Sequence, residues 1–265
     1  GGWLTRTLLN WGAEVVGVSL APDTDPNFFT ALNLVKKIKH HEVDIRDAAK
    51  LQQIWRDEAP EIVFHLAAQP LVRRSYDAPL DTHTTNIIGT ANVLEACRVV
   101  DSVRSVVIIT TDKVYRNDES GRPYQEGDAL GGHDPYSASK AAADIVTASY
   151  RDSFWPATEY GKKHRTLIGI ARSGNVFGGG DWAADRLIPD LVRAVYHTHT
   201  PLVVRNPQSI RPWQHVLEPT SGYLQLGKQL AEGNTAAASA WNFGPREQDV
   251  CTVDAMITQA IQTLG

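Results

Sequence analysis

The stretch VRSVVIITTDK, residues 103–113, decides the fold. We interpret it as an apolar β-strand that ends in Thr111, Asp112 and Lys113. Further strand-like runs alternate with longer helical patterns up to about residue 172. This alternation is typical of βαβ units on a parallel sheet. The sequence therefore predicts an α/β protein built around such a sheet.

The expected elements follow one another along most of the chain. Strands are expected at Glu14–Leu20, Glu61–Ala67, Val103–Thr110 and Thr166–Ala171, and helices at Leu4–Trp11, Ala48–Glu58, Leu80–Val99, Tyr136–Ser153 and about 187–197. Gly1 and Gly2 stand where a phosphate-binding loop would end, between a strand and a helix, yet no strand precedes them. We therefore expect the first central strand and the start of its glycine loop to lie outside the given chain.

The character of the sequence changes after Arg172. Glycine, proline and tryptophan cluster in residues 174–182, 205–213 and 241–245. Such loop-rich sequence after a regular α/β half indicates a smaller lobe packed against the sheet edge. We predict a Rossmann-type, doubly wound parallel sheet over residues 1–175 and a smaller C-terminal substrate-binding lobe over residues 176–265, whose last part is expected beyond the given chain.

Composition narrows the classes of function. The 265 residues carry a net charge of -4 and a pI of about 6.1, without the basic surplus of a nucleic-acid-binding protein. No run approaches the roughly 18 apolar residues of a membrane span, and no signal peptide is evident. Cys97 and Cys251 lie outside any CxxC pattern, which predicts reduced thiols, no metal site and a cytoplasmic protein.

Tyr136 and Lys140, in the segment YSASK, follow Lys113 after 23 residues. Residues four apart share one face of a helix, and an ammonium beside a phenol lowers the pKa of the phenol. A tyrosine with a lowered pKa is a base suited to the oxidation of an alcohol. Asp112 adds an acid and Lys113 a possible base, which suggests chemistry beyond plain oxidation.

Several longer segments match one family. They are HLAAQPLVRRSY (65–76), TDK (111–113), DPYSASK (134–140), GNVFGGGDW (174–182), IRPWQHV (210–216) and WNFGP (241–245). Through them the chain resembles, over nearly its whole length, the nucleotide-sugar 4,6-dehydratase branch of the extended short-chain dehydrogenases/reductases. The resemblance implies NAD as cofactor, CDP-glucose as substrate, a homodimer formed through the helices at 80–99 and 136–153, and a role in deoxysugar biosynthesis for O-antigen lipopolysaccharide.

The resemblance also assigns cofactor-binding residues, from the pyrophosphate to the nicotinamide ribose: Gly1, Asp44, Ile45, Leu66, Ala67, Ala68, Tyr136 and Lys140. Gly1 would be the last glycine of a GxxGxxG loop at a helix N-terminus. Asp44 and Ile45 would hold the adenine. Ser19 and Leu20 stand where an acid for the adenosine ribose is expected, and no arginine for a 2′-phosphate is found there, so NAD is favoured over NADP.

The reaction that the resemblance implies has three steps: oxidation of the sugar at C4, loss of water across C5 and C6, and return of the hydride to C6. Tyr136, as phenolate, would take the proton of the 4-hydroxyl, and Thr111 would hydrogen-bond the same oxygen. Asp112 is the candidate acid for the departing 6-hydroxyl, and Lys113 is the candidate base at C5. A free ammonium has a pKa of about 10.4, so this base needs a depressed pKa. The alternative for Lys113 is an ion pair with substrate phosphate or a neighbouring carboxylate.

The resemblance gives five candidate substrate-binding residues: Ser75 for the sugar, and Asn175, Arg186, Arg205 and Arg211 for the diphosphate or the sugar. Arg211 is preferred among the arginines because a guanidinium fork suits a diphosphate. His65 is interpreted as a structural histidine rather than a catalytic one. Asn86 matches a family position that braces the active-site helix.

Three other functions stay open at this point. A nucleotide-sugar 4-epimerase shares Tyr136 and Lys140 but needs no acid and base at C5 and C6, so Asp112 and Lys113 disfavour it. A dehydratase of another nucleotide sugar fits the same residues, because none of them distinguishes cytosine. A non-catalytic NAD-binding scaffold is disfavoured by the intact residues from Thr111 to Lys140.

Overall fold

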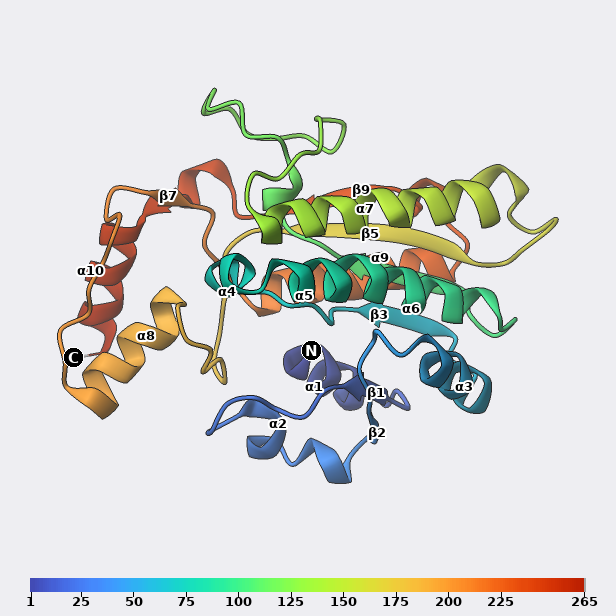
Figure 1. The fold of residues 1–265 in the computed structure, drawn as a ribbon, viewed down its shortest axis with the longest axis horizontal. Helices are drawn as coiled ribbons and strands as arrows, with labels where there is room; N and C mark the ends of the chain where they lie inside the picture. The colour runs from blue at the N-terminus through green and yellow to red at the C-terminus, as the bar shows by residue number, and fades with distance from the viewer. Residues whose placement is uncertain (265) are drawn as a thin grey trace.

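The computed structural model describes residues 1–264, and its centre is a parallel β-sheet (Figure 1). Four strands are hydrogen-bonded in the order β3-β4-β5-β9, and all three pairs are parallel. Their bounds are β3 Ile62–His65, β4 Ser105–Ile109, β5 Leu167–Ser173 and β9 Ala240–Phe243. The predicted α/β class and the predicted strands β3 to β5 are confirmed, whereas the sequence analysis did not identify β9.

A second parallel pair lies beside this sheet. It consists of β1, Val16–Ser19, and β2, Lys39–Glu42. The pair is not hydrogen-bonded to β3, so within residues 1–264 the parallel strands form three separate groups, the third being the short pair of β6, Val176–Phe177, and β8, Gln214–His215. The first central strand that a doubly wound sheet needs is not found among the described strands, which all follow α1, Gly2–Asn10.

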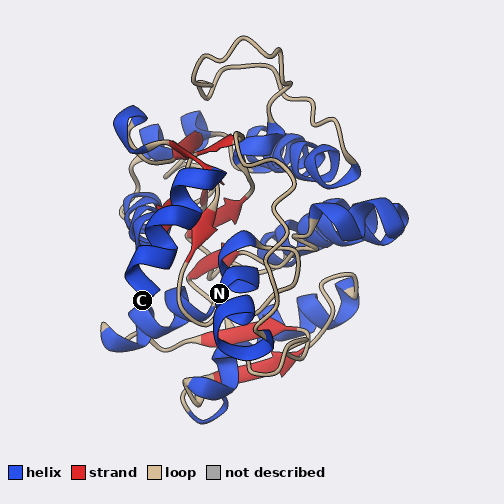
Figure 2. Ribbon diagram, turned by 90° about the vertical axis from the view of Figure 1, so that its left-hand side faces the viewer, coloured by secondary structure: helices blue, strands red, loops and turns tan. Residues whose placement is uncertain are grey.

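Helices cover both faces of the four-stranded sheet (Figure 2). The alternation of side chains along β4 explains why. Val106 and Ile108 point into a core formed with α3, Ala48–Glu58, and α6, Gly89–Arg98, whereas Val107 points into a second core formed with α9, Leu217–Ala231. Strands buried on both faces in this way are typical of parallel sheets.

The long helical segment predicted at Leu80–Val99 is present, but it contains a widened turn. It consists of α5, Pro79–His83, a π-helical turn η2, Thr84–Ile88, and α6. This segment packs against α7, Pro135–Phe154, which was predicted within one residue at each end. Turns of π-helix are rare and recur at functional sites.

The remaining elements are short, apart from α8 and α10. They are α2 Phe28–Ala31, η1 Leu34–Lys36, α4 Val72–Asp77, η3 Asp112–Val114, η4 Ala157–Glu159, β6 Val176–Phe177, α8 Leu187–Arg193, η5 Ala194–Thr198, β7 Ile210–Arg211, β8 Gln214–His215, η6 Thr235–Ala237, η7 Glu247–Asp249, β10 Cys251–Thr252 and α10 Val253–Leu264. Helices α8 and α10 lie together at the left of Figure 1, beside the antiparallel pair β7 and β10.

The chain after residue 175 does not form a lobe throughout. Helix α9 packs against β4 and β5, and β9 extends the sheet beside β5. Gly227 permits this close approach, because a Cβ there would lie 2.6 Å from the ring of Phe64. Residues 217–243 therefore return to the Rossmann-type sheet, and only the segments around α8 and α10 lie apart from it.

None of the described helices is both long and apolar enough to span a membrane. Within residues 1–264, no cluster of three or more histidine, cysteine, aspartate or glutamate side chains is suitable for a metal ion.

Candidate active site

The site forms where the C-terminal end of β4 meets the start of α7. Helix α7 begins sharply because Asp134 caps it: its carboxylate accepts the backbone N–H of Ser137 at 2.9 Å, and Pro135 occupies the first helical position. Tyr136 is therefore held in the first turn of the helix. The 3₁₀ turn η3 directly follows Thr111, whose hydroxyl accepts the backbone N–H of Lys113 at 3.4 Å.

Thr111 lies between the phenol of Tyr136 and the carboxyl group of Asp112. Its hydroxyl donates to Asp112 Oδ1 at 3.0 Å. Burial raises the pKa of Asp112 and also that of Tyr136, and for Tyr136 the nearby hydroxyl of Thr111 opposes the shift. A raised carboxyl pKa favours the protonated form, which is the form that a general acid needs.

The buried ammonium of Lys140 binds the backbone, and burial is the largest effect on the pKa of Tyr136, which is raised. The Nζ of Lys140 donates to the backbone carbonyl of Ile109 at 2.7 Å, at the end of β4. Burial lowers the pKa of Lys140 to about 8, and the carboxylate of Asp144 opposes that shift. The hydrogen-bond partner of Lys140 is a backbone carbonyl, which the sequence does not reveal.

Lys113 is exposed at the edge of the site. Among the described residues its ammonium forms no ion pair, so the structure does not contain the predicted alternative of a salt bridge to a neighbouring carboxylate. Its charge acts on Asp112 by lowering the pKa of that carboxyl group, against the larger effect of burial.

Ser75 lies beneath the site rather than at its surface. The side chain is fully buried, and its hydroxyl donates to Val72 O at 2.6 Å and accepts the backbone N–H of Tyr136 at 3.2 Å. This hydroxyl therefore positions the start of α7. The predicted contact of Ser75 with the sugar needs correction, because no part of the side chain is accessible to a ligand.

Asn86 braces α7 from the π-helical turn. Its Nδ2 donates to Ser139 Oγ at 2.8 Å, and its Oδ1 accepts the backbone N–H of Gln69 at 2.8 Å. His65 is buried and is hydrogen-bonded through Nε2 to Thr90 Oγ1 at 3.0 Å; burial lowers its pKa to about 3. These contacts agree with the bracing and structural roles expected for the two residues.

The predicted cofactor-binding residues lie along the C-terminal ends of the strands. Leu66, Ala67 and Ala68 directly follow β3 and are partly accessible. Gly1 is the N-cap of α1, and no side chain caps this helix N-terminus with a hydrogen bond. Small side chains and an uncapped helix N-terminus suit a dinucleotide pyrophosphate.

Two predicted adenine contacts are engaged within the protein. The carboxylate of Asp44 pairs with Arg46, at 2.5 Å between Oδ2 and Nη2, and this pair lowers the pKa of Asp44. Ile45 is buried against Gly89, where a Cβ would lie 2.4 Å from its Cδ1. The Asp44 carboxylate is therefore partly neutralised, and the Ile45 side chain belongs to the core.

Two of the predicted diphosphate-binding arginines lie near the reacting groups. Arg211, in β7, lowers the pKa of Asp112 through its charge, and Arg186 acts in the same direction on Tyr136. Asn175 follows β5, and its carbonyl accepts the backbone N–H of Gln214 at 2.9 Å. The structure thus places the charge of Arg211 near the carboxyl group of Asp112 and the charge of Arg186 near the phenol of Tyr136.

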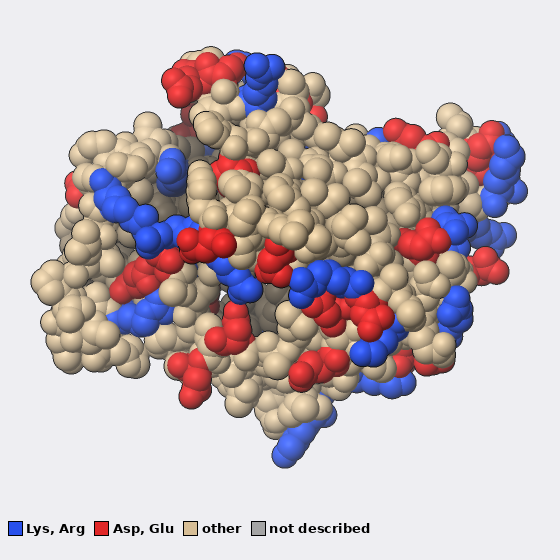
Figure 3. Space-filling model, in the orientation of Figure 1, with Lys and Arg blue, Asp and Glu red and all other residues tan. Residues whose placement is uncertain are grey.

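Arg205 lies further out and shares a carboxylate with another arginine. Asp185 Oδ1 is 2.7 Å from Arg73 Nη1 and 3.5 Å from Arg205 Nη2. The pair Asp185–Arg73 connects α4 to the loop before α8. On the face seen in Figure 3, acidic and basic side chains are interspersed over the central part of the molecule. Guanidinium groups suit a phosphate-bearing ligand.

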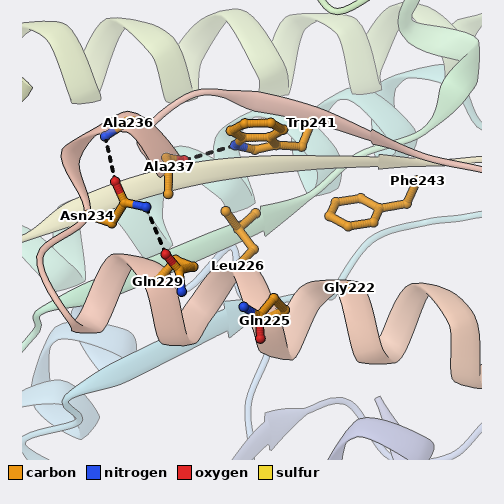
Figure 4. A pocket seen from close by; sticks show the side chains of 9 residues that line it. All are labelled: Gly222, Gln225, Leu226, Gln229, Asn234, Ala236, Ala237, Trp241 and Phe243. Atoms are coloured by element: carbon orange, nitrogen blue, oxygen red, sulfur yellow. Dashed lines mark hydrogen bonds between the residues drawn. The ribbon is translucent and has the colours of Figure 1, made fainter.

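Two pockets differ in their chemistry. One, of about 290 Å³, lies between the loop after β6 and helix α8 and is lined by Phe177–Trp182, Ile188, Pro189, Val192 and His215. The other, of about 300 Å³, lies between α9 and β9 (Figure 4) and carries no charged side chain in its lining. There Asn234 bonds Gln229 at 2.8 Å and Trp241 donates to Ala237 O at 3.0 Å, so its polar groups are satisfied internally. The second pocket has no means of holding a diphosphate.

The sequence analysis missed residues that support the site from behind. The buried pair Asp144–Arg172 and the contact of Ser173 Oγ with Tyr223 Oη at 2.5 Å were not identified. One signal was available: Asp144 stands four residues after Lys140, on the same face of the helix. Nothing in the sequence places Arg172 opposite that carboxylate.

The fold and site together define a Rossmann-type α/β protein that carries, at the end of the sheet, a tyrosine, a lysine and an aspartate whose pKa values are shifted by burial. Three-dimensional likeness supports this fold. The chain superposes with TM-score 0.81 on dTDP-glucose 4,6-dehydratase DesIV of Streptomyces venezuelae with NAD and TYD bound, at 23% identity, and on UDP-glucose 4-epimerase of Thermotoga maritima with UDP-glucose, at 19% identity. The alignments cover 100% and 99% of this chain and 78% of each of the other two.

Sequence comparison defines the family. The family model described as GDP-mannose 4,6 dehydratase matches residues 1–241. CDP-glucose 4,6-dehydratase of Salmonella typhimurium is 43% identical over 265 residues, which is 100% of this chain and 73% of that enzyme. The chain therefore belongs to the GDP-mannose 4,6-dehydratase family, and the nucleotide-sugar dehydratase resemblance found in its sequence is confirmed.

Proposed function

We propose that the protein is an NAD-dependent CDP-glucose 4,6-dehydratase, which forms CDP-4-keto-6-deoxyglucose. The observation that carries this proposal is the placement of Thr111, which donates to Asp112 Oδ1 at 3.0 Å and acts on the pKa of the Tyr136 phenol. It places a group suited to alcohol oxidation next to an acid suited to the loss of water. The 43% identity to the Salmonella enzyme over the whole chain supports CDP-glucose as the substrate.

The residues present fit NAD. The uncapped N-terminus of α1 suits the pyrophosphate, Ala67 and Ala68 leave room at the end of β3, and the ammonium of Lys140 suits the nicotinamide ribose. Bound NAD supplies the acceptor for the hydride that leaves C4 and the donor of the hydride that returns to C6. DesIV, a dehydratase of the same fold, holds NAD in its crystal structure.

Each reacting side chain then has one task. Tyr136 takes the proton of the 4-hydroxyl, and Thr111 holds the same oxygen. Asp112 protonates the departing 6-hydroxyl, for which its raised pKa is suited. Lys113 is assigned the removal of the C5 proton because it lies beside Asp112 and, among the described residues, is held by no ion pair; the task requires its neutral amine.

Substrate binding is assigned to the polar rim of the site. Arg186 and Arg211 are proposed to hold the diphosphate, with Arg205 and Asn175 further along the same ligand. The pocket beside Trp182 and His215 offers aromatic surface for the nucleobase. The 4-keto-6-deoxy product suits a pathway to deoxysugars such as those of the O-antigen, and the free thiols Cys97 and Cys251 support a cytoplasmic location.

The test is to incubate the NAD-loaded protein with CDP-glucose in D₂O and to follow the product by NMR. The proposal expects a 4-keto-6-deoxy sugar that carries deuterium at C5. UDP-glucose, dTDP-glucose and GDP-mannose serve as matched substrates. Turnover of one of these without turnover of CDP-glucose would refute the substrate, and a C4 epimer without deuterium at C5 would refute the dehydration.

We further propose a homodimer formed through α5, α6 and α7. Helices α5 and α7 and the turn η2, which lie side by side, expose large apolar side chains: Leu80, Ile88, Ile145 and Phe154, with exposures of 75%, 51%, 57% and 49%. Exposed apolar surface of this kind is typical of an interface. Light scattering is expected to give the mass of a dimer for the parent protein and of a monomer for Ile145→Glu, and a monomeric parent would refute the proposal.

A further inference from the structure

The ion pair between Asp144 and Arg172 lies beneath the site and has no part in the roles assigned above. The two side chains are only 3% and 5% exposed. The guanidinium is bidentate, with Nε and Nη2 each 2.8 Å from a carboxylate oxygen. Asp144 stands one helical turn after Lys140 on α7, and Arg172 lies near the end of β5. A buried pair with this geometry holds both groups charged and in fixed orientation.

Arg172 also connects the pair to the turn that carries the acid and the base. Its Nη1 donates to the hydroxyl of Tyr115 at 2.9 Å and to the carbonyl of Glu126 at 2.9 Å. Tyr115 directly follows η3 and donates to Asn242 Oδ1 at 2.6 Å, on β9. Hydrogen bonds therefore join α7, β5, η3 and β9 at one end of the sheet.

The groups around Lys140 give Asp144 an electrostatic role. From β3, His65 faces the ammonium as a neutral ring, because burial and the charge of Lys140 lower its pKa to about 3. From β4, the carbonyl of Ile109 accepts the ammonium proton, and the hydroxyl of Thr110 binds Asp144 at 3.3 Å. Tyr136 lies on the same helix as Lys140, and the guanidinium of Arg172, on β5, is paired with Asp144. Asp144 supplies the negative charge that opposes the effect of burial on Lys140.

We infer that Asp144 and Arg172 are positioning residues of the proposed dehydratase. Asp144 keeps the ammonium of Lys140 protonated, and Arg172 holds the turn Asp112–Val114 in place through Tyr115. This inference deepens the proposed function and rests on it for the roles of the reacting groups. It concerns the protonation state of one lysine and the position of one turn, so each part has its own measurement.

The first measurement is the titration of Lys140 in the full chain, by NMR of ¹⁵N-labelled lysine side chains, with Lys140→Arg to assign the signal. Asp144→Asn is expected to move the midpoint to lower pH by about one unit or more, the size of an effect from a lost opposite charge. Asp152→Asn is the matched control, because that carboxylate lies on the same helix and is 67% exposed. An unchanged midpoint in folded Asp144→Asn would overturn the electrostatic role, whether or not the protein turns over CDP-glucose.

The second measurement covers Arg172 and remains informative if Asp144→Asn fails to fold. Arg172→Lys keeps the charge opposite Asp144 but loses the fork that also reaches Tyr115. We expect a Lys140 midpoint near that of the parent and a kcat lowered about tenfold or more at unchanged KM for CDP-glucose. Tyr115→Phe removes the same connection with little change of shape and is expected to give the same result. An unchanged kcat in both variants would overturn the positioning of the turn, whereas absence of turnover in the parent protein would refute the proposed function instead.

Discussion

Gly174 lies directly against Asp112. A Cβ at Gly174 would come 3.0 Å from Asp112 Oδ2 and 2.7 Å from Pro212 Cγ. The proposed acid is thus held between the turn after β4 and the bare backbone after β5. Because Gly174 has no side chain, the backbone after β5 can lie close to the carboxyl group of Asp112.

Substitution of Gly174 by alanine is expected to displace Asp112 and Pro212 and to lower kcat about 10-fold to 100-fold, because small misplacements of reacting groups are costly. Gly244→Ala is the control, since a Cβ there meets nothing within 4 Å. Steady-state rates with CDP-glucose measure both variants. Equal rates for Gly174→Ala and the parent would show that this contact does not hold the acid.

Tyr136→Phe is expected to lower turnover about 100-fold or more, because the proton of the 4-hydroxyl loses its acceptor. Binding of NAD should be retained, since the ring and the fold around it stay in place. Calorimetry of NAD binding together with the product assay measures both effects. Tyr76→Phe, at a residue that is 63% exposed, should behave as the parent does.

Asp112→Asn is expected to separate the steps of the reaction. Oxidation at C4 needs no acid, so absorbance at 340 nm should rise as NADH accumulates while the 6-hydroxyl is retained. Lys113→Met should also block the loss of water, but without deuterium exchange at C5. Rapid product formation by either variant would remove that residue from the mechanism.

The free energy of unfolding should also depend on the protonation of Asp112. Burial raises its pKa in the folded protein, so the unfolded chain releases this proton first as pH rises. The free energy of unfolding therefore falls as pH rises toward and through the folded-state pKa. Asp112→Asn should raise Tm relative to the parent at pH 8 and do so much less near pH 3; a larger gain at pH 3 would contradict the raised pKa.

Arg211→Gln is expected to raise KM for CDP-glucose about tenfold with a smaller effect on kcat, because a charge-assisted hydrogen bond to phosphate is worth roughly 1.5–3 kcal/mol. Arg246→Gln is the matched control, because Arg246 is 78% exposed and pairs only with Asp249 among the described residues. Both are measured by initial rates at constant ionic strength. An unchanged KM would assign the diphosphate to other arginines.

The parts of the site that the sequence predicted depend on local chemistry. Pro135 and Asp134 specify the start of α7, so the position of Tyr136 on its first turn follows from neighbouring residues. The partner of Lys140 is a backbone carbonyl on another element, and no residue type reveals such a partner. Ser75 was misassigned for the same reason, since its burial depends on how α4 packs against α7.

Elements with a clear hydrophobic pattern in the sequence were predicted, and elements with a weak pattern were not. Strands β3 to β5 are short apolar runs between helical patterns, and they were found. Helix α9 was missed because Pro219 and Gly222 interrupt a sequence rich in loop-forming residues, although Tyr223, Leu226 and Leu230 form one buried face. The helical structure of this segment therefore depends on its packing against the sheet more than on the helix propensity of its residues.

The π-helical turn Thr84–Ile88, between α5 and α6, determines the direction in which the side chain of Asn86 points. Deleting one residue from it would restore ordinary α-helical winding and change the directions of the side chains within the turn. Asn86 would then turn away from Ser139, to which it now donates at 2.8 Å. The number of residues in the segment from α5 to α6 therefore determines whether the side-chain amide of Asn86 can reach Ser139 on α7.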